Sequence, residues 1–251
     1  MIERTHYKTI VISDIHLGYR QAKADQVIRF LSSVDCDKLI LNGDIVDGWQ
    51  LRKSGESRWR PEYTALMKVF MKMMENKGTE IIYIVGNHDE FLLNVVPFDT
   101  GQLKIYQDYV LDECGHRFFV THGDVFDDIS TNMRWLAKLG DVAYRILLRL
   151  NAIYNRYRLA KGKTGSTFSQ SLKLKVKSAV SSASGFEMMV QEVAKARKCD
   201  GVICGHIHHP EDKMIGKVRY LNSGDWVETM SALLEDEEGN WRIMYYTKEY
   251  E

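Results

Sequence analysis

Five short runs of β-branched and aliphatic residues in this chain end directly in polar clusters that contain Asp or His. DIH (14–16) follows KTIVIS, NGD (42–44) follows KLIL, and GNHD (86–89) follows EIIYIV. HGD (122–124) follows RFFVT, and GHIH (205–208) follows VIC. The loops after the strands of an α/β sheet converge on one crevice, which is where such folds place their active sites. The pattern therefore predicts strands that deliver polar side chains to a single site.

Helical spacing fills two of the segments between these strands. Residues 23–32 and 61–76 carry apolar side chains at three- and four-residue steps. Pro61 is well placed for the first turn of the second helix, and Gly78 is typical of a residue that ends one. Strands that alternate with helices predict an α/β domain.

A long segment of helical texture interrupts this alternation and carries an excess of positive charge. Residues 129–198 contain fourteen Lys and Arg against three acidic residues, and the opposite excess elsewhere brings the net charge of the chain to zero. We expect a single domain over residues 1–251 with a basic helical insertion at 129–198. Two interpretations of the insertion stay open. It is either an amphipathic cap with solvated basic residues, or a lid that binds acyl chains, phosphate or an anionic membrane surface.

Composition excludes several classes of protein. The chain is 45% hydrophobic and 27% charged, as globular proteins are, and no run approaches the length of a membrane-spanning helix. The N-terminal residues lack a small-residue cleavage site, so we expect a first strand there and not a signal peptide. The four cysteines show neither CxxC spacing nor a dense framework, which predicts reduced thiols and a cytoplasmic protein.

The polar clusters combine the donors of a transition-metal site. Asp oxygens with His nitrogens suit Mn²⁺, Fe, Zn²⁺ or Co²⁺ better than Ca²⁺. In D-x-H and H-x-H, ligands two apart on an extended segment would point the same way. The candidate ligands are Asp14, His16, Asp44, Asn87, His122, His206 and His208. These are too many for one ion with an open position, and they fit two divalent ions that share a carboxylate. Two ions roughly 3.5–4 Å apart can hold a hydroxide nucleophile and phosphoryl oxygens for an in-line displacement.

The order D-x-H, G-D, G-N-H-D, H-G-D and G-H-x-H resembles the calcineurin-like metallophosphoesterase superfamily. The resemblance implies an α/β, four-layer sandwich of two mixed β-sheets flanked by helices, with a helical lid insertion and a di-metal centre at one edge. It implies one ion held by Asp14, His16 and His208, a second held by Asn87, His122 and His206, and Asp44 as the bridge. His88 would face the leaving group as general acid or hydrogen-bond donor, and Asp89 would orient His88. Mn²⁺ is the metal expected for the family.

Longer segments are similar to the UDP-2,3-diacylglucosamine pyrophosphohydrolases of lipid A synthesis within that superfamily. The similar segments are ISDIHLG, NGDIVDGW, THGDVFDD and YLNSGDWVETMSAL, together with the basic insertion. This resemblance implies a nucleotide-linked lipid pyrophosphate as substrate, a lipid phosphate and UMP as products, and a cytoplasmic protein peripheral to the inner membrane. That family commonly has G-N-R-D where this chain has His88, which is typical of the broader phosphoesterases.

Other functions stay open at the level of sequence. The same ligands fit a phosphodiesterase or phosphomonoesterase that acts on a soluble ester. A nuclease is less favoured, because the basic insertion is rich in aliphatic residues and has no identifiable stacking platform. A non-catalytic scaffold of the same fold is disfavoured by the complete ligand set and by the His88–Asp89 pair. Asp47 is expected to be solvated or to support a ligand.

Overall fold

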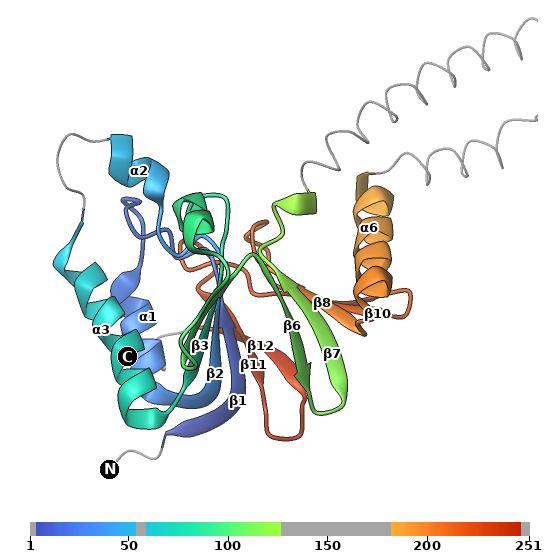
Figure 1. Ribbon diagram of the computed structural model, residues 1–251, viewed down its shortest axis with the longest axis horizontal. Helices are drawn as coiled ribbons and strands as arrows, with labels where there is room; N and C mark the ends of the chain where they lie inside the picture. The colour runs from blue at the N-terminus through green and yellow to red at the C-terminus, as the bar shows by residue number, and fades with distance from the viewer. Residues whose placement is uncertain (1–3, 54–58, 127–181, 247–251) are drawn as a thin grey trace, which may run out of the picture. The chain divides into compact units, whose positions relative to one another are not determined.

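The computed structural model describes residues 4–53, 59–126 and 182–246 (Figure 1). The chain divides into two compact units, one formed by Met1–Asp124 with Val190–Glu251 and the other by Val125–Met189. The insertion expected at 129–198 lies outside the described residues as far as residue 181. No helix in the described ranges is long and apolar enough to cross a membrane.

A seven-stranded mixed sheet forms the first half of the main unit. Its order is β12 (Trp241–Tyr245), β11 (Ser231–Glu235), β1 (Thr5–Ile12), β2 (Val34–Asn42), β3 (Glu80–Ile84), β5 (Leu103–Tyr106) and β4 (Phe98–Asp99). The strands β1, β2, β3 and β5 run parallel to one another, and β11, β12 and β4 are added in antiparallel pairs. Three helical segments follow these strands: α1 (Ala24–Ser33), α2 (Gly48–Lys53) and the 3-10 helix η1 (Glu90–Val95). A longer helix, α3 (Pro61–Lys77), lies between α2 and β3 in the chain.

Alternation of side chains along the strands gives this sheet two buried faces. In β1, Ile10 and Ile12 belong to a core that includes Phe30 of α1 and Leu66 of α3, whereas Val11 belongs to a second core. Both faces are therefore covered, as expected of strands that are apolar at nearly every position.

The second sheet has five strands and supplies the other wall of the second core. Its order is β6 (Asp108–Glu113), β7 (His116–Thr121), β8 (Gly201–Cys204), β10 (Val218–Asn222) and β9 (Glu211–Ile215). The central strands β7, β8 and β10 are parallel, and the edge strands are antiparallel. Phe118 and Val120 of β7 share this core with Ile82 and Ile84 of β3. The strands β6 and β7 form a hairpin around Cys114 and Gly115.

Helices lie on the outer sides of both sheets. Helix α6 (Ser182–Arg197) ends beside the second sheet, where the Arg197 guanidinium lies 4.8 Å from the centre of the Phe119 ring and 2.9 Å from an Asp108 carboxylate oxygen (Figure 1). Helix α3 begins at Pro61 and ends at Lys77, and Gly78 caps it with a left-handed φ of 69°, as the sequence predicted. The predicted α/β sandwich of two mixed sheets flanked by helices is confirmed.

Candidate metal centre

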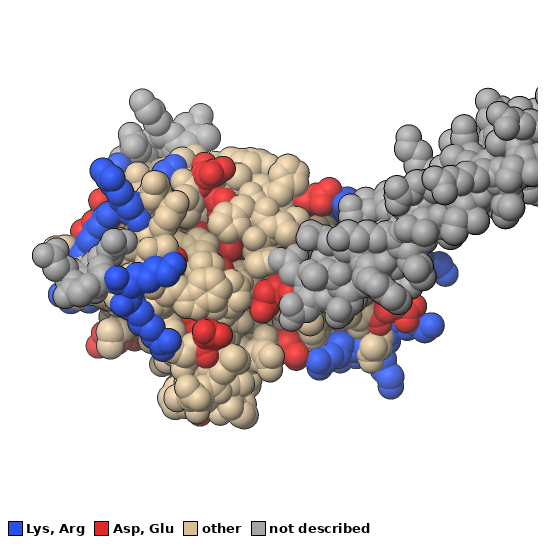
Figure 2. All heavy atoms as spheres, turned by 90° about the horizontal axis from the view of Figure 1, so that it is seen from above, with Lys and Arg blue, Asp and Glu red and all other residues tan. Residues whose placement is uncertain are grey.

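The five polar clusters gather where β1, β2, β3, β7 and β8 end. Their candidate ligands are mostly withdrawn from solvent, with Asp14 and His122 fully buried and Asp44 2% exposed. Figure 2 looks down on this end of the molecule, where acidic side chains show between uncharged ones and Lys and Arg gather at the margins. The strand ends bring six of the seven candidate ligands into three groups, one of which includes His88, and within each group the donor atoms lie within 4.8 Å of one another.

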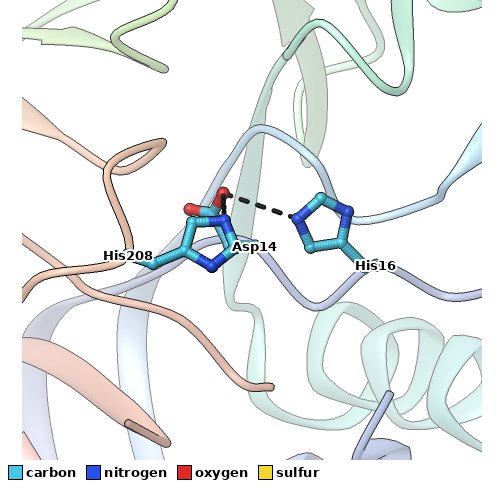
Figure 3. A group of neighbouring side chains, drawn as sticks. All are labelled: Asp14, His16 and His208. Carbon is cyan, nitrogen blue, oxygen red and sulfur yellow. Dashed lines mark ion pairs between the residues drawn. The ribbon is translucent and has the colours of Figure 1, made fainter. Parts of the chain in front are cut away.

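The first group consists of Asp14, His16 and His208. Both imidazoles are directed at the same oxygen of the Asp14 carboxylate (Figure 3), and their ring centroids lie 5.4 Å apart. Oδ1 of Asp14 lies 3.2 Å from Nε2 of His208 and 3.8 Å from Nε2 of His16. The other oxygen, Oδ2, accepts a hydrogen bond of 3.0 Å from the main-chain N–H of His206. One carboxylate oxygen is therefore fixed by the main chain and the other is directed at two ring nitrogens.

Asp44 belongs to both of the remaining groups, one with His122 and His206 and one with His16 and His88. Its Oδ2 lies 3.3 Å from Nε2 of His122, 3.8 Å from Nε2 of His16 and 3.9 Å from Nε2 of His88. Its Oδ1 accepts a 2.8 Å hydrogen bond from the main-chain N–H of His88. A carboxylate in this position has ligand nitrogens on two sides, which is the arrangement that a bridging ligand requires.

Most of the candidate ligands adopt a left-handed backbone conformation. The φ angles are 53° for Asp14, 52° for His16, 55° for Asp44, 65° for His206 and 53° for His208. The expectation that the ligands of D-x-H and H-x-H converge because their backbone is extended is therefore wrong. Left-handed residues are uncommon outside glycine and cluster at functional sites, where the surrounding structure holds them in place.

The donor atoms at the site fit a pair of divalent cations. Oδ1 of Asn87 is buried and has no hydrogen-bond partner among the described residues. Oδ1 of Asp14 and Nε2 of His122 contact other candidate ligands but form no hydrogen bond there. Nδ1 of His122 lies 2.9 Å from the carbonyl oxygen of Asn42, to which it donates when Nε2 is left for a metal. Buried polar atoms normally have partners, and carboxylate, amide and imidazole donors together suit a transition metal.

Opposite charges in this group shift the pKa values of its members. Burial opposes ionisation of Asp44, but its contact with His122 outweighs burial and lowers the pKa of Asp44 to about 2. Burial likewise opposes a charge on His122, yet Asp44 and Asp14 raise the pKa of that ring to about 10. A cation bound among these carboxylates would compete with the imidazole proton, because metal ligands bind in their deprotonated form.

His88 lies at the edge of the site with a quarter of its side chain exposed. Its Nδ1 is 3.3 Å from Oδ1 of Asp47, and its ring lies against that of Trp49 at 4.2 Å between centroids. Asp47 is 2% exposed, and its Oδ2 also lies 3.8 Å from Nδ1 of His16. Of the two roles expected for Asp47, the structure therefore places it beside the imidazoles and not in solvent.

Asp89 was expected to orient His88, but in the structure its carboxylate contacts other groups. The Asp89 carboxylate accepts hydrogen bonds from the main-chain N–H groups of Ile45 and Gly86 and from the hydroxyl of Tyr83. The turn after β3 folds this carboxylate back onto its own loop, so the carboxylate beside the His88 ring is that of Asp47. Burial raises the pKa of Asp89 to about 6, against the hydrogen bond from Tyr83 and with a contribution from Asp44.

Asp225 is a site residue that the sequence analysis did not single out. It lies after β10 and is fully buried, and its Oδ2 is 3.0 Å from Nδ1 of His208. Burial opposes ionisation of this group, but His208 and three main-chain N–H groups lower the pKa of Asp225 to about 2. The only signal in the sequence was another polar residue just after a short apolar run, and an isolated Asp after Ser-Gly is equally typical of a turn.

Two glycines allow the ligands to approach the main chain. A Cβ built on Gly43 would overlap the ring of His122, and one built on Gly86 would overlap the carboxylate of Asp44. The glycines of N-G-D and G-N-H-D thus make room for ligands that come from neighbouring loops.

The chain is similar to known proteins in sequence and in structure. A family model described as calcineurin-like phosphoesterase matches residues 7–210. The UDP-2,3-diacylglucosamine hydrolase of Aeromonas salmonicida (strain A449) is 26% identical over 235 residues, which cover 90% of this chain and 89% of that protein. The protein of the same name from Aliivibrio fischeri (strain MJ11) is 26% identical over 240 residues, covering 89% and 92%. A solved archaeal phosphodiesterase is 16% identical, with a TM-score of 0.47 over 95% of this chain and 99% of that one.

Proposed function

Because this chain belongs to the calcineurin-like phosphoesterase family, we propose that it hydrolyses the pyrophosphate of UDP-2,3-diacylglucosamine or a similar nucleotide-linked lipid. The products would be a lipid phosphate and UMP. Membership in the family makes the protein a metal-dependent hydrolase of phosphoester or pyrophosphate bonds. The observation that carries the proposal is Asp44, whose carboxylate is shared by two groups of metal-ligand donors.

The residues divide into two sets around Asp44. Asp14, His16 and His208 would hold one cation, and Asn87, His122 and His206 the other, with Asp44 between them. Bound divalent cations supply a water-derived nucleophile at neutral pH and neutralise charge on phosphoryl oxygens. Mn²⁺ is the proposed metal, because these mixed Asp and His donors suit it and the family resemblance favours it over Fe, Zn²⁺ or Co²⁺.

His88 would serve the leaving group. Its ring stands at the edge of the ligand cluster, with Nδ1 toward Asp47 and Nε2 toward Asp44. A proton on Nε2 can pass to the oxygen that leaves phosphorus, while Asp47 accepts from Nδ1–H and keeps the ring in that orientation. In this proposal Asp89 acts on His88 indirectly. Its carboxylate accepts a hydrogen bond from the main-chain N–H of Gly86 and so fixes the loop that carries His88.

Exposed apolar side chains on the segments around His88 support a lipid-linked substrate. Five side chains of α2, η1 and β4 are each 37–49% exposed: Trp49, Phe91, Leu93, Val95 and Phe98. We call this set the apolar rim. The two helical segments adjoin, since Nε1 of Trp49 donates to Glu90 over 3.3 Å and the Phe91 ring lies against Gly48. Exposed apolar side chains next to a polar site provide surface for acyl chains outside it.

The first experiment compares two substrates with Mn²⁺ present. UMP release from UDP-2,3-diacylglucosamine is measured beside hydrolysis of a soluble chromogenic phosphodiester, with His88→Ala as the control. We expect fast UMP release that is lost in the variant. Turnover of the soluble ester alone would move the substrate to the soluble phosphate esters, the alternative that His88 in G-N-H-D favours. A variant of Asp44 that stays fully functional in cells would favour a non-catalytic scaffold.

Variants of the apolar rim test the lipid part separately. Leu93→Glu should raise KM for the lipid substrate and leave the soluble ester unchanged, because only the lipid reaches the rim. Met71→Glu is the matched control, since Met71 is 62% exposed on α3. Equal KM values for Leu93→Glu and the unmodified chain would remove the rim from the proposal.

The proposed location is the cytoplasm, peripheral to the inner membrane. The four cysteines are free thiols, which suits a reducing compartment. The basic insertion at 129–198 would contact anionic lipid, with each basic residue near the surface worth about 1 kcal/mol. Arg145→Glu with Arg149→Glu should weaken liposome binding or lipid turnover, and unchanged values for both would contradict a membrane role. Nucleic acid is not a proposed partner.

A further inference from the structure

A buried carboxylate stands behind one of the proposed metal ligands. Asp225 has no exposed surface, and its Oδ1 accepts hydrogen bonds from three successive main-chain N–H groups. The donors are Val227 at 3.0 Å, Glu228 at 2.7 Å and Thr229 at 2.9 Å. Oδ2 is buried, and its contact among the described residues is with Nδ1 of His208 at 3.0 Å. One oxygen is thus held by the turn, and the other is directed at the imidazole.

His208 depends on such a support more than the buried ligands do. Its side chain is 38% exposed, whereas that of His122 is fully buried and cannot turn freely. The ring lies between two carboxylates, with Nδ1 toward Asp225 and Nε2 at 3.2 Å from Oδ1 of Asp14. A carboxylate that accepts from Nδ1–H fixes the tautomer of the ring and leaves the lone pair of Nε2 for a cation.

The loop that carries Asp225 also supports Asp14. The main-chain N–H of Trp226 donates to the carbonyl oxygen of Asp14 over 3.1 Å. The hydroxyl of Ser13 donates to the carbonyl oxygen of Gly224 over 2.9 Å. Trp226 is fully buried, and its ring lies 5.4 Å from that of Phe30 in the core under α1. The carboxylate is therefore anchored to the core, and its position relative to Asp14 is fixed.

We propose that Asp225 is a positioning residue of the metal centre, which holds the His208 ring so that Nε2 faces the cation shared with Asp14 and His16. The inference rests on the proposed function only for the identity of that cation site. It assigns to Asp225 no contact with substrate or with the reacting atoms.

The test is the affinity of the full chain for Mn²⁺ alone, measured by calorimetry after removal of metal with a chelator. Asp225→Asn keeps the size of the side chain but offers one acceptor oxygen in place of two. We expect it to weaken one of the two Mn²⁺ sites about 10–100-fold and to leave the other unchanged, as loss of a ligand's hydrogen-bond partner does elsewhere.

Thr229→Val is the matched control. It removes the Thr229 hydroxyl, which donates to the same carboxylate over 3.3 Å, without touching His208. If Asp225 only stabilises its turn, both variants weaken Mn²⁺ binding alike or neither does, and either result overturns the proposal. Thermal unfolding of the metal-free variants separates a weaker site from a damaged fold.

A second measurement does not require the Asn variant to fold. In the Zn²⁺-loaded chain with ¹⁵N-labelled histidine, we expect the Nδ1–H proton of His208 to exchange slowly with solvent, assigned by its absence in His208→Gln. A His208 ring with its proton on Nε2, or an Nδ1–H that exchanges freely, contradicts the proposal. Failure of the proposed substrate is distinguishable, because a chain whose Mn²⁺ binding depends on Asp225 but which does not cleave the lipid overturns the substrate alone.

Discussion

The Asp47 carboxylate lies beside two imidazoles of the site at once. Its two oxygens face Nδ1 of His88 at 3.3 Å and Nδ1 of His16 at 3.8 Å. A group that acts through a catalytic ring should have no effect once that ring is removed. The kinetic effects of Asp47 and His88 are therefore expected to be strongly non-additive.

Asp47→Asn should lower kcat about 10–100-fold, because the His88 ring loses the charge that orients it. Steady-state kinetics on Asp47→Asn, His88→Ala and the double variant check this. The double variant should be no slower than His88→Ala alone. Additive losses, or a loss of bound metal in Asp47→Asn, would instead place the role of Asp47 at His16.

Gly86 tests how closely the ligands are packed. Its φ is not in the left-handed region, so alanine is allowed there by conformation, but a Cβ would overlap the Asp44 carboxylate and lie 2.6 Å from the Asp44 main-chain nitrogen. Gly86→Ala should weaken Mn²⁺ binding and lower the free energy of unfolding by about 1–3 kcal/mol. Calorimetric titration and denaturant unfolding measure the two effects. Gly101→Ala, which has open space around it but a left-handed φ of 88°, should lose some stability and keep full metal affinity.

Strand β11 carries a buried acid that is not among the candidate metal ligands. Glu235 is 1% exposed and opposite Thr9 of β1. Burial raises the pKa of Glu235 above 4.5, with a contribution from Glu113 and against the opposing effect of the neighbouring Thr9. The folded state therefore holds this proton at pH values where the unfolded chain has lost it. The contribution of Glu235 to stability is greatest below pH 4.5 and is lost as pH rises through the folded pKa.

Glu235→Gln should remove that loss. We expect the variant to have a larger free energy of unfolding than the unmodified chain at neutral pH and a flatter dependence on pH above 4.5. Urea unfolding between pH 4 and 8 gives the comparison, with exposed Glu238→Gln as control. If the variant and the unmodified chain have equal free energies of unfolding at neutral pH, burial does not disfavour the charged form of Glu235.

The strands also show which parts of the structure were predictable. Each ligand motif stood next to a short apolar run, so the strands β1, β2, β3, β7 and β8 and their polar ends followed from local pattern. The left-handed backbone of Asp14 and His208 did not, because contacts between loops impose it. Asp225 was missed for the same reason: its partner His208 comes from a different strand end, and a single sequence does not report that pairing.

The fold of the whole chain holds two buried carboxylates of the site close together. Asp14 and Asp44 are buried near one another with imidazoles between them. A cation that binds only the folded chain stabilises it by about 2.7 kcal/mol when free metal is at 100 times its Kd. The melting temperature should therefore rise with added Mn²⁺ and fall with a chelator, as calorimetric scans would measure. His122→Gln should abolish most of this shift, whereas exposed His116→Gln should keep it. A shift that survives in His122→Gln would place the bound metal elsewhere.

The sheet order has one more consequence, which concerns the making of the protein. Strand β1 pairs with β2, which follows it closely, and with β11, which is near the end of the chain. Asp14 precedes His206, His208 and Asp225 in the order of synthesis, with most of the strands of both sheets between them. A nascent chain thus exposes some of its candidate metal-binding side chains long before the others have been made. Metal can be captured in its final geometry only after residue 225 has been synthesised and β11 has paired with β1, so loading is expected to follow folding of the main unit.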